Sequence, residues 1–289
     1  MDRALWKQIL RAVRSADRVV PRTGRRAFFR DQQIVKMYLW AVWHDRPLCW
    51  ACDRSHYSTL YRPKQLPSVS QFCRRVKQRR ITQMLAGVHE YLTHREEPVK
   101  LGFFDGKPLP VSDYSRDPDA RDGFGGGNMH RGYKLHAWTT EDARIVRYCV
   151  RPINEAEPRV ALGLVDRIAP NMLVLADANY DSRFLYEAVA ERGARLLTPL
   201  KGRGRSPQVL RRMPAARRAA LAWWESDPEG CHRLLQQRGA IERNFSALTC
   251  FGGGLGPLPS WVRRLDRVER WVTAKLAIYH ARLLCREVA

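Results

Sequence analysis

The order of the short apolar runs between residues 99 and 200 constrains the fold of this chain more than any other feature. These runs are, in chain order, "VKLGFFD", "YKLHAWTT", "RIVRYCVR", "NMLVLAD" and "ARLLTPLKG". The second and third read as two strands of a hairpin joined by "EDA", whereas the last two alternate with segments of helical periodicity. Antiparallel strands followed by alternating strands and helices predict a mixed sheet with helices on both faces.

The predicted element order is β-β-β-α-β-α-β-α, which matches a ribonuclease-H-like fold in the α/β class. We expect this domain to span residues 99–289. The pattern changes at Glu97 and Pro98, and the residues before this point read as helical, which predicts a separate helical N-terminal domain over residues 1–98. A length of 289 residues suits two compact units.

The N-terminal region contains a strongly basic segment that is expected to be helical. Ser68 and Gln71 form an S-x-x-Q capping box at its start. The helix that follows carries Arg74, Arg75, Lys77, Arg79 and Arg80. Two helices separated by a loop, with the second one basic, resemble a helix-turn-helix reader of DNA. The sequence is equally compatible with a solvated basic face on an ordinary helical bundle.

The charge balance indicates a polyanionic partner. The chain carries 51 Lys and Arg residues against 29 Asp and Glu residues, a net charge of +22, and nucleic acid is the first candidate because neutralised phosphates release counterions. A second basic stretch, which contains Lys201, Arg203 and Arg205, is expected to track DNA. No stretch approaches 18 uncharged apolar residues, so no membrane span is predicted. We therefore expect a cytoplasmic protein that associates with the nucleoid.

The cysteines leave one metal question open. Seven scattered cysteines, an odd number, argue against a disulfide framework. Cys49 and Cys52 have the C-x-x-C spacing of a zinc knuckle, with His44 and His56 nearby. There is no second C-x-x-C pair, and isolated cysteines are commonly packed core residues, so packing is favoured over zinc.

Two apolar runs of the predicted sheet each reach an aspartate. Asp105 ends "FFD" and Asp177 ends "LAD". If the two strands are neighbours, the carboxylates meet at one sheet edge, repel one another and raise each other's pKa. A divalent cation with oxygen ligands, Mg²⁺ or Mn²⁺, removes that penalty. Glu242, beside the buried stripe of "RGAIERNF", is a plausible third carboxylate, and Arg238 precedes it by four residues and is placed to orient it or to hold a phosphate.

At these residues the chain resembles the DDE transposases of bacterial insertion sequences. The matching segments are "FFDGKPL", "HRGYKLHAW", "VLADANYDS", "RGAIERNFSALT" and the long C-terminal segment from Leu258. The resemblance implies that Asp105, Asp177 and Glu242 are the catalytic and metal-binding residues. The family signature Y-(2)-R-(3)-E-(6)-K keeps its Arg and Glu here, whereas Leu235 and Thr249 replace its Tyr and Lys.

The resemblance also implies a reaction, cofactors and partners. Two Mg²⁺ or Mn²⁺ ions assist cleavage at the ends of the element, and the freed 3′-hydroxyl then attacks target DNA. The expected partners are double-stranded DNA, as terminal inverted repeats and as target, and a second copy of the chain in a homodimer. Lys134 and His136 are expected to contact DNA phosphates or to support the metal ligands. The alternatives are a nuclease without strand transfer and an inactive DNA-binding derivative.

Overall fold

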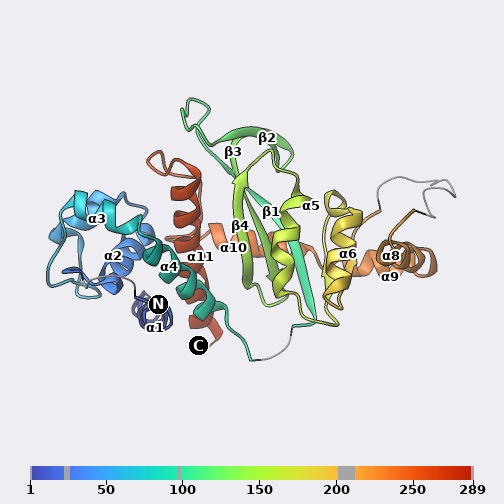
Figure 1. Ribbon diagram of the computed structural model, residues 1–289, viewed down its shortest axis with the longest axis horizontal. Helices are drawn as coiled ribbons and strands as arrows, with labels where there is room; N and C mark the ends of the chain where they lie inside the picture. Colours follow the sequence, from blue (N-terminus) through green and yellow to red (C-terminus); the bar gives the residue numbers. More distant parts are fainter. Residues whose placement is uncertain (1, 23–26, 97–98, 201–211, 288–289) are drawn as a thin grey trace. The chain divides into compact units, whose positions relative to one another are not determined.

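The computed structural model describes residues 2–22, 27–96, 99–200 and 212–287. Its internal contacts divide the chain into two compact units. One unit, residues 95–247, contains the sheet, and the other, residues 1–94 together with 248–289, is helical (Figure 1). We call them the sheet unit and the helical unit.

In the described part of the sheet unit, six strands form one mixed sheet. They are β1 (Leu101–Pro110), β2 (Arg121–Gly125), β3 (Asn128–Thr140), β4 (Ile145–Pro152), β5 (Leu173–Leu175) and β6 (Arg195–Leu197). β1 pairs antiparallel with β3 and parallel with β5, β3 pairs antiparallel with β4, and β5 pairs parallel with β6. The short β2 extends the sheet by pairing with the first residues of β3. The predicted hairpin and the predicted ribonuclease-H-like mixed sheet are therefore confirmed.

Helices cover the sheet after the third long strand. They are α5 (Glu157–Ala161), the 3₁₀ segments η3 (Leu162–Arg167) and η4 (Ala178–Tyr180), α6 (Arg183–Glu191), α8 (Ala215–Ser226), α9 (Pro228–Gln236) and α10 (Gly239–Thr249). Figure 1 shows α5 in front of the sheet and α10 behind it. The core on the α5 side joins Phe104 and Trp138 of the strands to Leu164 of η3 and Tyr186 of α6.

The segment "RLLQQRGAIERNFSALT", expected to be one helix, forms two. The backbone N–H groups of Gln237 and Arg238 donate to Leu234 and Leu235, three residues back, so the last turn of α9 is tightened. Gly239 follows, and glycine weakens a helix interior. α10 therefore starts as a separate helix, and it carries Glu242.

A close approach of two strands depends on a glycine. A Cβ built on Gly102 of β1 would lie 2.0 Å from the ring of Trp138, which β3 contributes. Trp138 is 1% exposed and belongs to the core. The glycine in "VKLGFFD" therefore leaves the space that this tryptophan fills.

The helical unit contains four helices from the N-terminal region and one from the C-terminal end within its described residues. They are α1 (Asp2–Val19), α2 (Asp31–Trp43), α3 (Val69–Val76), α4 (Arg79–Thr93) and α11 (Leu265–Glu287), with the 3₁₀ segments η1 (Leu48–Cys52) and η2 (Arg54–His56). The predicted capping box is confirmed, because the Ser68 and Gln71 side chains bond reciprocally to the backbone at the start of α3. The basic segment is divided between α3 and α4.

The position of α11 differs from the predicted domain division. It packs against α1, α2 and α4, so residues 248–289 belong to the helical unit. Val268, Val272, Leu276 and Tyr279 are almost completely buried, and so are residues on the other faces of the helix, including Lys275. A helix buried on all sides takes the centre of a bundle. No described helix is long and apolar enough to cross a membrane.

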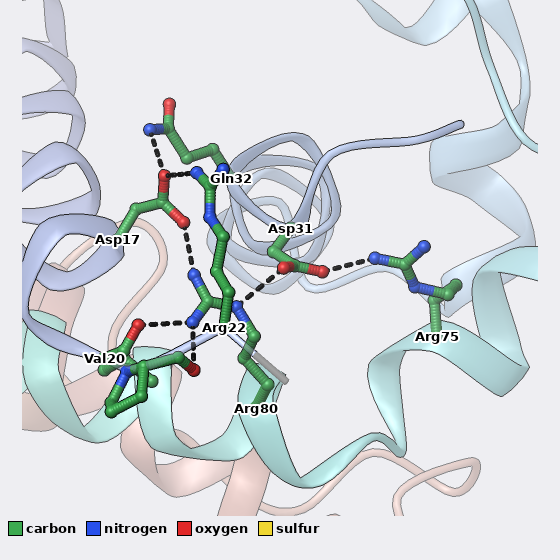
Figure 2. A network of polar contacts seen from close by, with 8 residues as sticks. Asp17, Val20, Arg22, Asp31, Gln32, Arg75 and Arg80 are labelled. Carbon is green, nitrogen blue, oxygen red and sulfur yellow. Dashed lines mark hydrogen bonds and ion pairs between the residues drawn. The ribbon is translucent and has the colours of Figure 1, made fainter. Parts of the chain in front are cut away.

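An ion-pair network ties the first four helices together (Figure 2). The guanidinium of Arg80, 10% exposed, binds Asp17 of α1 at 2.6 Å and Asp31 of α2 at 2.7 Å, and it also donates to the carbonyls of Val20 and Pro21. Asp31 in turn binds Arg75 of α3. The planar guanidinium serves this geometry because its donors point in fixed, divergent directions.

Candidate active site

Asp105 and Asp177 come from neighbouring parallel strands. The last registered pair of β1 and β5 is Phe103 with Leu175, and each aspartate stands two residues further along its chain. Two residues along a strand return to the same face, so both carboxylates belong to one face of the sheet. The expectation of a strand end holds for Asp177, which follows β5. It is wrong for Asp105, because β1 continues to Pro110 by pairing with β3.

Local backbone groups orient both aspartates. The N–H of Gly106 donates to Oδ1 of Asp105 at 2.7 Å, and the N–H of Asn179 donates to Oδ1 of Asp177 at 2.7 Å. Asp177 thereby caps the short segment η4. In each carboxylate the second oxygen takes no part in this bond. An aspartate that only forms a turn makes the same bond, so the bond alone does not indicate function.

Several charged groups act electrostatically on Asp105. Burial raises the pKa of Asp105 to about 6; the Gly106 N–H and Arg238 oppose the rise, whereas Asp177 and Glu157 add to it. Burial also raises the pKa of Tyr180 well above its ordinary value, and the same three carboxylates add to that rise. Asp105, Asp177 and Glu157 therefore share one electrostatic environment, which we call the carboxylate cluster, with Arg238 as its nearby cation.

Glu157 is the member of the cluster that the sequence did not predict. It opens α5, and its Oε1 accepts from Nζ of Lys134 at 2.7 Å. The same oxygen lies 3.2 Å from the position of a Cβ built on Gly106, so the missing side chain of that glycine makes room for it. Because Gly106 and Lys134 face away from Asp105, Glu157 acts on Asp105 from the opposite face of the sheet. Its Oε2 is buried without a hydrogen-bond partner among the described residues. The sequence signal that could have indicated Glu157 is its position as an acidic residue at the start of the helix that follows β4.

Glu242 occupies a different environment. It is exposed on α10, one helical turn beyond Arg238. Arg238 is partly buried and acts on both Asp105 and Tyr180. Within the described residues, no group of three or more His, Cys, Asp or Glu side chains is arranged to hold a metal ion. Asp105, Asp177 and Arg238 thus influence one another, and metal ligation by Asp105, Asp177 and Glu242 stays a prediction.

A family comparison bears directly on this arrangement. The family model for the transposase DDE domain matches residues 99–279, which is more than half of the chain. The chain belongs to the transposase DDE domain family. Neither the curated proteins nor the solved structures contain a match. The ribonuclease-H-like sheet agrees with this membership, and the family acts on DNA and generally uses divalent metal ions.

Lys134 and His136 are internal in this transposase. Across β1 and β3, His136 pairs with Gly106 and Ala137 pairs with Asp105, so His136 lies on the face opposite Asp105. It is 1% exposed, and burial lowers its pKa to about 3, so it is neutral at physiological pH. Lys134 is 6% exposed and held by Glu157. This burial favours support of the cluster over contact with phosphates.

The predicted DNA-contacting residues of the helical unit differ in exposure. Arg74 and Lys77 are exposed. The side chain of Arg75 is 14% exposed and bound to Asp31, as Figure 2 shows, so it first serves the packing of α2 and α3. Lys201, Arg203 and Arg205 lie outside the described residues.

The possible zinc ligands of the helical unit take other partners. The ring of His44 packs on Trp40 with centroids 4.4 Å apart, and the ring of His56 stacks on Trp50 at 4.5 Å. Nδ1 of His56 also lies 2.8 Å from the Trp50 carbonyl. Cys49 and Cys52 are free thiols, and they form no metal-ligating group with other described residues. The structure does not place these cysteines in a core as expected, because Cys49 is exposed and Cys52 is only partly buried.

Proposed function

We propose that this transposase cleaves DNA at the ends of an insertion sequence and joins the freed 3′-hydroxyl to target DNA. Asp105, Asp177 and Glu242 are the proposed catalytic and metal-binding residues. The observation that carries the proposal is the placement of Asp105 and Asp177 on one face of two adjacent strands, where their charges oppose each other. Such a pair is costly without a cation, and a cost of this kind is typical of functional sites.

The donor set suits Mg²⁺ or Mn²⁺. Asp105 and Asp177 offer hard oxygen atoms, and the partial burial of Asp105 disfavours its charged form unless a cation compensates. Glu242, one turn from Arg238, is the proposed third ligand. Bound divalent ions would activate the attacking oxygen and stabilise the leaving oxygen of an in-line displacement.

The remaining residues of the cluster have roles that follow from their contacts. Arg238 offsets negative charge at Asp105, and its Nε is buried without a hydrogen-bond partner among the described residues. We propose that its guanidinium binds a phosphate oxygen of the DNA. Lys134 neutralises Glu157, which limits the number of uncompensated carboxylates near Asp105. No Ser or Tyr nucleophile is required, because water and the 3′-hydroxyl attack in turn.

The decisive experiment combines cleavage and strand transfer in one assay. Donor DNA carrying the flanking ends of the element is incubated with the purified chain and Mg²⁺ or Mn²⁺, and both 3′-hydroxyl cleavage and joining to a plasmid are measured. Asp105→Asn is expected to lower cleavage by about a thousandfold while DNA binding persists, because it removes a charged ligand from a metal site. Asp122→Asn, at an exposed position of β2, is the matched control.

The outcomes separate the possible functions. Cleavage without joining identifies a nuclease, and DNA binding without cleavage by the unaltered chain identifies an inactive derivative. Cleavage that survives Asp105→Asn refutes the catalytic assignment. Glu242→Gln, compared with Glu157→Gln on the opposite face of the sheet in the same assay and in Mn²⁺ titrations, tests Glu242 as the third ligand. We also propose that the chain works as a homodimer bound to DNA of the nucleoid, which light scattering of the DNA complex tests.

A further inference from the structure

The helical unit contains a pocket of about 280 Å³ that is separate from the carboxylate cluster. It is lined by residues of η1 and α3 and by residues at and before the start of α11. Val76, Val262 and Trp271 form an apolar floor, and each of them is at most 5% exposed. The volume is close to the lower end of small-ligand sites, roughly 300 Å³, so one compact planar group fits it.

Two large apolar side chains at this pocket are exposed to solvent. Trp261 is 41% exposed and Val69 is 45% exposed, and both line the pocket. An exposed tryptophan beside an apolar hollow leaves an aromatic face uncovered. A nucleobase is a planar group that stacks on such a face whatever its sequence.

The charged residues of the lining are all cationic. Arg46, Lys77 and Arg267 are exposed, and the structure records no carboxylate partner for their side chains among the described residues. The fourth cation, Arg270, is bound to Asp266 at 2.7 Å. An apolar floor with an unneutralised cationic rim complements a ligand that has a flat apolar part and a nearby anion. Like charge disfavours a second copy of this chain, which carries +22, as the occupant of this pocket.

We propose that this pocket binds one unstacked nucleotide of DNA. Its base stacks on Trp261 above the apolar floor, and Arg46, Lys77 and Arg267 hold the phosphates on either side. The proposal rests on the proposed function in taking DNA as the ligand, and it adds a base-binding site to the helical unit. It also assigns Lys77 a position, at the edge of a base-binding pocket, that a generally basic surface would not require.

Two duplexes test the proposal: one contains a single unpaired 2-aminopurine nucleotide, and the other has the same sequence fully paired. We expect the unaltered chain to bind the unpaired duplex more tightly and to quench its 2-aminopurine fluorescence by stacking. Trp261→Ala is expected to weaken binding of the unpaired duplex about 5- to 100-fold and to abolish the quenching, while the paired duplex is little affected. Trp261→Phe keeps an aromatic face and is expected to restore most of the preference.

Tyr91→Ala is the matched control, because Tyr91 is an aromatic residue of the same unit with 42% exposure and does not line the pocket. Lys77→Ala is expected to reduce the salt dependence of binding by about one released counterion. The proposal is overturned if the unaltered chain binds DNA without preferring the unpaired duplex, or if folded Trp261→Ala retains preference and quenching. It is equally overturned if Trp261→Ala alters only self-association. Failure of the unaltered chain to bind either duplex refutes the proposed function instead.

Discussion

Replacing Asp105 by Asn is expected to stabilise the protein at neutral pH while it removes the proposed activity. Burial raises the pKa of Asp105 from 3.8 to about 6, so folding favours its protonated form. The contribution of Asp105 to the free energy of unfolding is therefore fully present below pH 3.8, where the carboxyl is protonated in both states. It is lost as the pH rises through about 6. A shift of roughly two pKa units at 1.36 kcal/mol each amounts to about 3 kcal/mol. The uncharged Asn side chain avoids this cost.

The assay is urea unfolding followed by circular dichroism between pH 3 and pH 8. The free energy of unfolding of Asp105→Asn should exceed that of the unaltered chain by up to about 3 kcal/mol at pH 8, with the excess vanishing near pH 3. Asp122→Asn, whose side chain is 66% exposed, should show no such pH dependence. An excess that is equal at both ends of the pH range would refute the burial argument. Added Mg²⁺ should stabilise the unaltered chain more than Asp105→Asn.

Three further substitutions test the packing. Arg80→Lys should lower the melting temperature of the helical unit and its free energy of unfolding by about 3 kcal/mol. The reason is that an ammonium cannot reproduce the divergent contacts in Figure 2. An unchanged melting curve would contradict this expectation. Gly102→Ala should cost at least about 2 kcal/mol in urea unfolding, since its Cβ meets the Trp138 ring, whereas Gly163→Ala, with open space around it, should cost far less. Asp45→Asn should lower the free energy of unfolding by about 2 kcal/mol in urea, because buried Lys275 loses its charged partner at 2.6 Å. Equal stability of the two proteins would show that the Gly253 carbonyl alone satisfies the Lys275 ammonium.

Features that depend on neighbouring residues were predictable from the sequence. The capping box of Ser68 and Gln71 forms as expected because both partners lie within one helical turn. The hairpin of β3 and β4 and the apolar strand before Asp177 follow from alternation and turn residues. The break between α9 and α10 was not predicted, because the periodicity continues through Arg238 while the backbone does not.

Features that depend on packing between distant segments were not predictable. Glu157 reads as an ordinary acidic residue in a first helical turn, where it complements the helix dipole. Its place beside Gly106 depends on how α5 packs over β3 and on the ion pair with Lys134. Arg75 likewise reads as a DNA contact until α2 brings Asp31 to it.

The sequence by itself determined the order of strands and helices, the excess of positive charge and the two aspartates that follow apolar runs. These properties are written in residue type and spacing, so they need no knowledge of the fold. The tertiary structure alone decided which charges pair: Lys134 binds Glu157, and Arg75 and Arg80 bind Asp31. Electrostatic and packing energies depend on distances through space, and only the folded chain sets those distances.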